Sequence, residues 1–193
     1  MIVDTRRGLM ETARQLASPN CDDRPPAAAI ELVVIHGISL PPGEFGGPWI
    51  DDLFLNRLDP AAHPCFRELD GLKVSSHLLI RRDGELVQYV PFHRRAWHAG
   101  QSCFGDRTAC NDFSIGIELE GEDVTPYTDV QYRILNEVLD ALMRAYPGIG
   151  PGRIVGHSDI APGRKTDPGP AFDWSRLAVR RDPACGTQGN DMP

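Results

Sequence analysis

Runs of β-branched and aliphatic residues predict a sheet with at least one strand buried on both faces. Residues 31–38 are nearly all apolar, which is the pattern of a central strand covered on both sides. Residues 74–81 and 86–90 are two further β-type runs, and the turn that joins them contains Asp83 and Gly84. Because an Asp-Gly pair between two apolar runs is a strong turn signal, this stretch predicts a β-hairpin.

Residues 113–120 alternate in polarity, as expected of a strand whose two faces have different surroundings. One face carries Ile115, Ile117 and Leu119, and the other carries Ser114, Gly116, Glu118 and Glu120. The two glutamates are either solvated or directed into a site. In the second case Glu118 is a candidate proton shuttle, and Gly116 leaves space beside it.

Two stretches have helical periodicity. A short helix is predicted after Pro48, with the apolar side chains of Trp49, Ile50, Leu53, Phe54 and Leu58 on one face. A longer helix is predicted from Thr128, where Thr128 and Gln131 fit a capping box, and it ends before Pro147. Its apolar stripe consists of Val130, Ile134, Leu135, Val138, Leu139, Leu142 and Met143.

Strands interleaved with helices predict a single α/β domain with a mixed central β-sheet flanked by helices. The expected catalytic core covers about residues 30–177. Residues 1–29 have weak periodicity and are expected to form a lead-in that packs late or loosely, and residues 178–193 are expected to form a frayed tail. In open sheets of this kind, ligands bind beyond the strand ends.

The length and the net charge of the chain limit the classes of function that it can have. A chain of 193 residues fits one domain. A net charge of -7 argues against sequence-independent binding to nucleic acid, which requires clustered Lys and Arg. The N-terminal segment has no apolar run long enough for a signal peptide or a membrane span, so we expect a cytoplasmic protein without membrane partners. Five scattered cysteines without a Cys-x-x-Cys pair indicate free thiols.

Candidate chemistry is concentrated in residues 155–174. His157 is expected at the end of a strand, and a loop rich in proline and glycine then brings Lys165 and Asp167 back toward it. A histidine and an aspartate suit a catalytic zinc ion, which usually takes three protein ligands, so a third ligand must come from elsewhere. The alternative is an ordinary surface loop in which His157 and Asp167 pair with each other.

His36 is the candidate for the third ligand. It lies near the end of the predicted strand 31–38, where loops and ligands gather, although a core histidine bonded to backbone is the alternative. If this strand neighbours the strand before His157, both imidazoles can share one metal ion with Asp167. His77 lies within a predicted strand and is expected to be structural.

Several long blocks resemble the cytosolic 1,6-anhydro-N-acetylmuramyl-L-alanine amidases, which belong to the zinc-dependent N-acetylmuramoyl-L-alanine amidase family. The similarity extends from about residue 32 to residue 174. Its blocks are His36 and residues 38–49, 76–84, 95–100, 110–121 and 156–169. Members of the wider family, which includes the peptidoglycan recognition proteins, have a mixed sheet flanked by helices.

The resemblance implies a ligand set and a reaction. His36, His157 and Asp167 would hold one Zn²⁺ per chain, and Glu118 and Lys165 would be the catalytic side chains. The bond cut would be the amide between 1,6-anhydro-N-acetylmuramic acid and L-alanine of muropeptides, in cell-wall recycling. Zinc suits this reaction because it activates water and polarises a carbonyl, while Glu118 would transfer the proton and Lys165 would steady the oxyanion.

Three positions depart from the pattern of this family. Gly37 replaces the usual Asn, Lys73 replaces a common Arg, and Ala109 replaces another Arg. Because Arg makes bidentate contacts with carboxylates, these changes are expected to affect affinity for the acidic stem peptide, with Arg107 as a possible replacement. Substrate contacts are therefore assigned to Lys73, Arg107, Trp97 and His98, the last two as a wall against the sugar or the peptide.

Two other functions fit the same residues. One is a peptidoglycan-binding module without catalysis, although the presence of all three ligands together with Glu118 and Lys165 argues against it. The other is an amidase that acts on intact murein. The expected partner is an anhydro-muropeptide substrate, and the expected state is a monomer.

Overall fold

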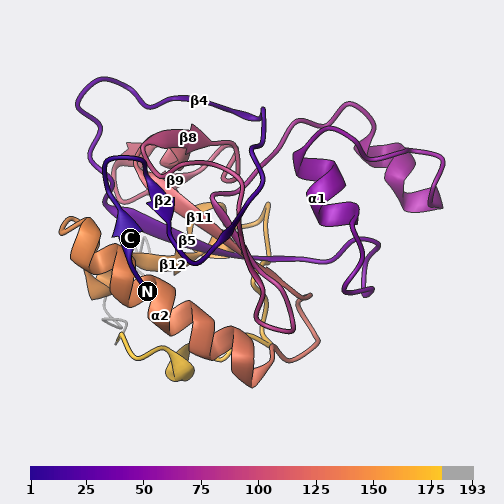
Figure 1. Cartoon of the computed structure of the whole chain (residues 1–193). Helices are drawn as coiled ribbons and strands as arrows, with labels where there is room; N and C mark the ends of the chain where they lie inside the picture. Colours follow the sequence, from indigo (N-terminus) through magenta and orange to yellow (C-terminus); the bar gives the residue numbers. More distant parts are fainter. Residues whose placement is uncertain (180–193) are drawn as a thin grey trace, which may run out of the picture.

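A six-stranded mixed sheet forms the centre of the computed structural model, which describes residues 1–179 (Figure 1). The strand order is β12 (Ile154–Gly156), β5 (Leu32–Ile38), β11 (Ser114–Glu120), β6 (Leu78–Ile80), β7 (Leu86–Gln88) and β3 (Arg14–Gln15). Neighbouring strands are parallel except for the hairpin β6–β7. The predicted α/β class, the single domain and the predicted hairpin are therefore confirmed.

The two faces of the sheet are covered by different elements. Helix α2 (Asp129–Ala145) covers one face (Figure 1), where Ile115, Ile117 and Leu119 join the largest apolar cluster. The other face is covered by α1 (Trp49–Phe54) and α3 (His157–Ile160) with their loops. Glu118 belongs to this second face because side chains alternate along β11.

Both predicted helices are present, but the first is shorter than predicted, because it ends at Phe54 and leaves Leu58 outside. Thr128 caps α2 in a capping box with Gln131, and the helix ends at Ala145 before Pro147. Helix α1 begins directly after Pro48 and buries Ile50, Leu53 and Phe54. The shorter elements are β8 (Arg94–Ala96), β9 (Cys103–Phe104), β10 (Arg107–Thr108) and four 3₁₀ turns, η1 (Pro64–Leu69), η2 (Cys110–Asp112), η3 (Pro151–Arg153) and η4 (Trp174–Arg176).

The expectation that residues 1–29 pack loosely is wrong. This segment forms β1 (Val3–Asp4), β2 (Leu9–Met10), β3 and β4 (Cys21–Asp23), of which β3 is an edge strand of the central sheet and β4 pairs with β8. Met10 is fully buried, and its backbone N–H donates to Gln88 over 2.7 Å. Strands of two or three residues are too short to give a periodic signal, so the sequence pattern did not reveal them.

Arg24 ties this segment to the middle of the chain. Its guanidinium donates to the backbone carbonyls of Phe92, Asn111, Asp112 and Ser114 at 2.8 to 3.1 Å. Burial lowers the pKa of Arg24 to about 10, so the side chain stays charged at neutral pH. A guanidinium that satisfies four carbonyls ties the N-terminal segment to Phe92 and to residues 111–114 at once.

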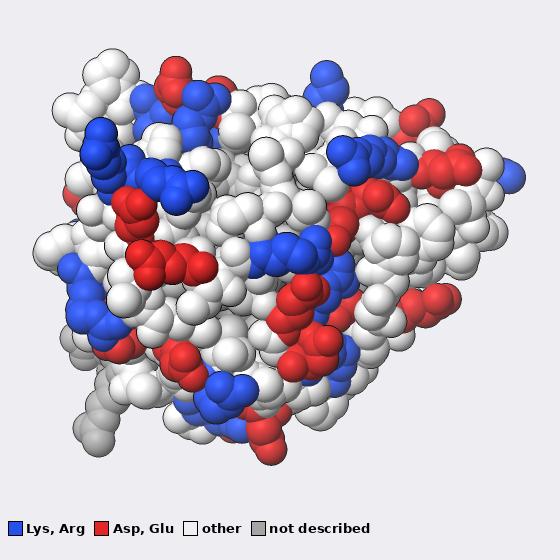
Figure 2. Space-filling view, viewed as in Figure 1, with Lys and Arg blue, Asp and Glu red and all other residues white. Residues whose placement is uncertain are grey.

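The surface is mixed in charge. On the face shown in Figure 2, Lys and Arg side chains are interspersed with Asp and Glu side chains. Several arginines of the described chain form ion pairs, including Arg14 with Glu85 and Arg95 with Asp22. No helix within residues 1–179 is both long and apolar enough to cross a membrane. The predicted tail lies outside the described residues from position 180 onward, as does Cys185, and the four described cysteines are free thiols.

Candidate metal centre

Three neighbouring parallel strands bring the key side chains into one row. In the register of β5 and β11, His36 is paired with Glu118. In the register of β12 and β5, Gly156 is paired with Ile35, which places His157 beside His36 one residue later. Paired residues of parallel strands point to the same face, so His157, His36 and Glu118 lie side by side at the carboxyl edge of the sheet, on the face opposite α2.

Asp167 completes a compact cluster with the two histidines. The Nδ1 atoms of His36 and His157 are 3.0 Å apart, and Oδ2 of Asp167 lies 3.1 Å from each. Each residue offers one donor atom to a common point, and the three donor atoms lie within 4.8 Å of one another. The sequence prediction that His36, His157 and Asp167 meet is confirmed as a geometric fact, and the set is consistent with a metal site.

The electrostatics of the cluster favour a bound cation. Burial lowers the pKa of His36 to about 4, so its imidazole is neutral at physiological pH. Oδ2 of Asp167 lies 3.1 Å from Nδ1 of both rings, so a carboxylate oxygen faces the two nitrogen atoms. A neutral imidazole and an ionised carboxylate are the protonation states that a metal ion requires of these ligands.

The backbone around Asp167 is held from two sides. Ser158 donates its N–H to the Asp167 carbonyl over 3.0 Å, and the hydroxyl of Tyr127 donates to the carbonyl of Pro168, also over 3.0 Å. The Tyr127 ring packs against Gly37 and Gly121, and a Cβ atom at either glycine would overlap with it. This gives Gly37 a structural role in this chain, because a larger side chain there must displace the Tyr127 hydroxyl.

Replacing Tyr127 with Phe is expected to lower the free energy of unfolding by about 1 kcal/mol, since the buried Pro168 carbonyl loses its donor. Tyr146→Phe is the matched control, because the Tyr146 hydroxyl is buried without a hydrogen-bond partner in the described part of the chain. Urea denaturation of both variants checks this. Equal effects of the two substitutions would show that the Tyr127 hydroxyl does not brace the loop.

Glu118 is buried beside the cluster and is incompletely bonded. Its side chain is 9% exposed, and its Oε2 atom has no hydrogen-bond partner among residues 1–179. Burial raises the pKa of Glu118 well above its ordinary value, the charge of Asp167 raises it further, and Lys165 acts in the opposite direction. Native proteins rarely leave a buried carboxylate oxygen unbonded, so this atom points to a functional role.

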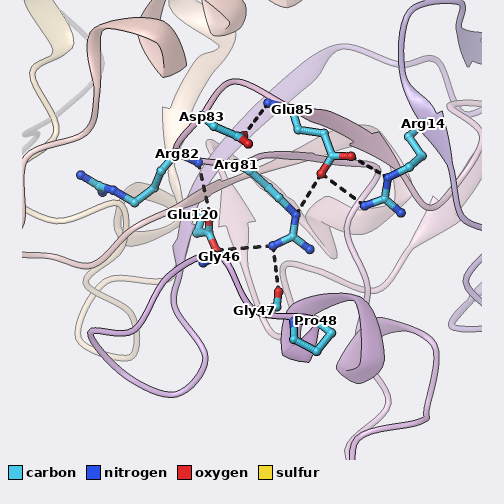
Figure 3. A pocket seen from close by; sticks show the side chains of 9 residues that line it. All are labelled: Arg14, Gly46, Gly47, Pro48, Arg81, Arg82, Asp83, Glu85 and Glu120. Carbon is cyan, nitrogen blue, oxygen red and sulfur yellow. Dashed lines mark hydrogen bonds and ion pairs between the residues drawn. The ribbon is translucent and has the colours of Figure 1, made fainter.

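Glu120, on the same face of β11, is fully engaged in structure. It accepts from the backbone N–H groups of Gly46 at 2.6 Å and Arg82 at 3.1 Å, and from the guanidinium of Arg81 at 3.4 Å (Figure 3). These residues line a cavity of about 530 Å³ next to the β6–β7 turn. Neither glutamate is solvated, which excludes that alternative for both, and Glu120 holds the loop before α1 against the sheet.

A cavity of about 560 Å³ opens beside Asp167 and contains Lys165. It lies between three loops that follow β5, β11 and α3, and its walls include Gly37, Glu122 and Arg164. Lys165 is exposed, and its charge reaches both Glu118 and His36. Asp167 of the cluster and Lys165 therefore border a space that a substrate can enter, and His36, His157 and Glu118 are buried next to Asp167.

The four residues assigned to substrate contacts do not line this cavity. Trp97 is half-buried and donates its indole N–H to Asp22 over 3.1 Å. Lys73 is exposed and borders a separate cavity of about 240 Å³ next to Phe66 and Leu69. The ring of His98 lies behind His36, with 2.9 Å between its Nδ1 and Nε2 of His36.

Arg107 lies at the opposite edge of the sheet. Its guanidinium stacks on the Phe113 ring at 3.7 Å and pairs with Glu31 at 2.6 Å. Glu31 directly precedes β5, and Phe113 directly precedes β11. His36 lies five residues after Glu31 along β5, which corresponds to roughly 16 Å because a strand rises about 3.3 Å per residue. Arg107 is therefore held away from the metal-ligand candidates.

Three structural contributors were not identified from the sequence. They are Tyr127, Asn111 and Arg164. Asn111 accepts from the backbone N–H groups of His98 and Ala99 through one oxygen, at 3.2 and 2.8 Å. Arg164 donates to the Ala99 carbonyl over 2.7 Å. No local pattern distinguishes these residues from ordinary loop or helix-flanking positions, because each acts through a partner distant in the chain.

Comparison with known proteins agrees with this geometry. Residues 26–170 match the family model described as N-acetylmuramoyl-L-alanine amidase. The chain is 60% identical over 173 residues to the 1,6-anhydro-N-acetylmuramyl-L-alanine amidase AmpD of Escherichia coli (strain K12), covering 90% of this chain and 94% of that protein.

Solved structures give the same result. A crystal structure of a selenomethionine derivative of AmpD is 57% identical, with a TM-score of 0.88 over 92% of this chain and 97% of that chain. The amidase AmiD of E. coli, solved with the substrate anhydro-N-acetylmuramic acid-L-Ala-D-γ-Glu-L-Lys, is 32% identical, with a TM-score of 0.57 over 80% of this chain and 59% of that chain.

Proposed function

The chain belongs to the N-acetylmuramoyl-L-alanine amidase family, and we propose that it hydrolyses the amide bond between 1,6-anhydro-N-acetylmuramic acid and L-alanine in muropeptides. The observation that carries this proposal is the unbonded oxygen of buried Glu118, placed in register with His36 beside the three donor atoms. A binding module needs neither a carboxyl of raised pKa nor a buried acceptor without a partner.

The donor set fits zinc. Two imidazole nitrogens and one carboxylate oxygen are ligands that a catalytic zinc ion accepts, with a further position for solvent. His157 supports this fit, because its Nε2 lies 3.1 Å from the Ala99 carbonyl, which can only accept. Nε2 therefore donates to this carbonyl, and Nδ1 is the ring nitrogen directed at Asp167. When bound, zinc would supply Lewis acidity to water and to the amide carbonyl.

Glu118 and Lys165 supply the remaining chemistry. Glu118, whose pKa burial raises well above that of an ordinary carboxyl, would take a proton from the attacking water and donate it to the leaving amine of L-alanine. Lys165 borders the same cavity and would stabilise the negative charge that develops on the carbonyl oxygen. Exposure leaves the Lys165 side chain free to approach substrate from the solvent side.

The anhydro-muropeptide assignment rests on the relatives. Identity of 60% to an amidase with this specificity supports the same substrate here. The solved complex of AmiD with an anhydro-muramyl peptide supports a site that accepts both the sugar and the peptide. We place the reaction in the cytoplasm, as in the recycling amidases that the sequence resembles, and we propose that one chain with one Zn²⁺ is the active unit.

The decisive experiment offers the purified chain anhydro-muropeptide and intact sacculi in parallel. Stem peptide, measured by mass spectrometry, is expected to be released from the anhydro-muropeptide, to stop after treatment with a chelator and to resume when zinc is added. Release that continues after complete metal removal would exclude this mechanism. Faster release from intact sacculi would support an amidase of murein instead, and binding without release would support the non-catalytic module.

A further inference from the structure

We infer that His98 and Ser114 are positioning residues that orient a chain of hydrogen bonds so that His36 presents a bare Nδ1 atom to the metal ion. This inference rests on the proposed metal site and goes beyond it, because neither residue contacts the ion or the substrate. The geometry consists of three consecutive hydrogen bonds that begin at a backbone carbonyl and end at the His36 ring.

The first bond fixes the direction of the chain. The hydroxyl of Ser114 lies 2.6 Å from the carbonyl oxygen of Cys110, which has no proton to give, so Ser114 is the donor. A hydroxyl carries one proton, and this bond uses it. The second contact of Ser114, 3.1 Å from Nε2 of His98, therefore has Ser114 as the acceptor and the His98 Nε2–H as the donor.

The second bond determines the third. A neutral imidazole carries one N–H, so His98 with its proton on Nε2 has a lone pair on Nδ1. This lone pair lies 2.9 Å from Nε2 of His36, which must then carry the proton of His36. Nδ1 of His36 is left bare, and it is the atom that lies 3.0 to 3.1 Å from the other two candidate ligands.

The segment formed by His98 and Ala99 contacts both candidate histidine ligands, each through a different group. His157 donates its Nε2–H to the carbonyl of Ala99, which can only accept, so the direction of this hydrogen bond needs no other residue. His36 faces the ring of His98, which could accept or donate, so the direction must be imposed from Ser114. Both backbone N–H groups of this segment, at His98 and Ala99, are held by Asn111.

The space around His98 indicates that its ring is seated specifically. A Cβ atom at Gly116 would lie 2.5 to 2.8 Å from three atoms of the His98 ring, so the ring occupies the room that a glycine in β11 provides. Ser114 precedes this glycine by two residues on the same face of the strand and is fully buried. One face of β11 therefore supplies the acceptor, the space for the ring and the proton carrier Glu118.

The tautomers can be read directly by nuclear magnetic resonance. Histidine nitrogens of the uniformly ¹⁵N-labelled protein are recorded at about pH 8 in the metal-free and the zinc-loaded states, where neutral imidazoles dominate. His98 is expected as the Nε2–H tautomer in both states, and His36 as the Nε2–H tautomer in the metal-free state. A His98 ring with its proton on Nδ1 would overturn the inference without reference to any variant.

A matched pair of variants tests the consequence. Ser114→Ala removes the acceptor that orients His98, and the dissociation constant for zinc, measured by competition with a chromogenic chelator, is expected to rise about 10-fold or more. Ser76→Ala is the control, because Ser76 is also fully buried but its hydroxyl has no hydrogen-bond partner among the described residues. Ser114→Thr, which keeps the hydroxyl, is expected to restore most of the affinity.

The outcomes separate this inference from the proposed function. Equal zinc affinities for Ser114→Ala and Ser76→Ala would overturn the positioning role even if the amidase reaction is zinc-dependent. The expected tautomers and affinities in a protein that releases no stem peptide would leave the positioning role intact and overturn the amidase proposal. If Ser114→Ala does not fold, the tautomers of the unsubstituted protein decide the question.

Discussion

Replacing Asp167 with Ala is expected to abolish zinc binding and amidase activity together. Asp167 supplies the anionic donor of the cluster, 3.1 Å from both Nδ1 atoms, and its removal leaves only the two imidazoles. Two neutral ligands bind a divalent ion far more weakly than a set that includes a carboxylate. We therefore expect activity at limiting zinc to fall by on the order of 10³-fold or more, since the loss of the ion removes both activated water and carbonyl polarisation.

Asp123→Ala is the control for this variant. Asp123 lines the same cavity and carries the same charge, but the metal cluster does not include it. Bound zinc is measured by elemental analysis after gel filtration, and activity by release of stem peptide. An Asp167→Ala protein that retains one zinc ion and normal turnover would show that the carboxylate is not a ligand, and the cluster would lose its catalytic interpretation.

The sequence predicted this cluster because its members occupy positions that local patterns reveal. His36 and His157 each follow an apolar run, so both were expected at strand ends. The sequence did not reveal the order of the strands, and the structure shows that β12 and β5 are neighbours. Asp167 depended on the resemblance to known amidases, because a carboxylate in a proline-rich loop has no periodic pattern that fixes its direction.

Positions that act through the backbone of distant segments were beyond sequence reasoning. His98 was expected to contact substrate, yet its ring lies against His36, an arrangement set by Asn111 and Gly116 rather than by neighbours in sequence. Arg107 was expected near the stem peptide but stacks on Phe113. In both cases the residue type suggested a contact with ligand, whereas the loop's tertiary path determined which partner was within reach.

Glu118→Gln is expected to lower turnover by about 10²- to 10⁴-fold while zinc remains bound, since the amide cannot take a proton from water. The substitution keeps the size of the side chain, and Glu118 is not one of the three residues of the cluster. Lys165→Ala is likewise expected to keep zinc and lose most of its turnover. Loss of zinc in Glu118→Gln would instead mean that Glu118 supports the ligands rather than the proton transfer.

The two catalytic substitutions differ in what they do to stability, because only Glu118 is buried. Burial raises the pKa of Glu118 well above its ordinary value of 4.5, so the folded carboxyl keeps its proton at pH values where the unfolded carboxyl has lost it. The folded state then binds more protons than the unfolded state. Its free energy of unfolding must therefore fall as pH rises from the ordinary pKa through the raised one.

Glutamine does not titrate, so Glu118→Gln is expected to remove this contribution from the metal-free protein. Relative to the unsubstituted chain, the variant should gain stability as the pH rises from about 5 to about 8. Urea denaturation at both pH values, in the presence of a chelator, measures the change, and Lys165→Ala should show no such trend because its side chain is exposed. A pH-independent difference would mean that Glu118 is ionised when folded. A carboxyl that destabilises the fold at neutral pH, and does so beside three converging donor atoms, is more readily explained by proton transfer in catalysis than by packing.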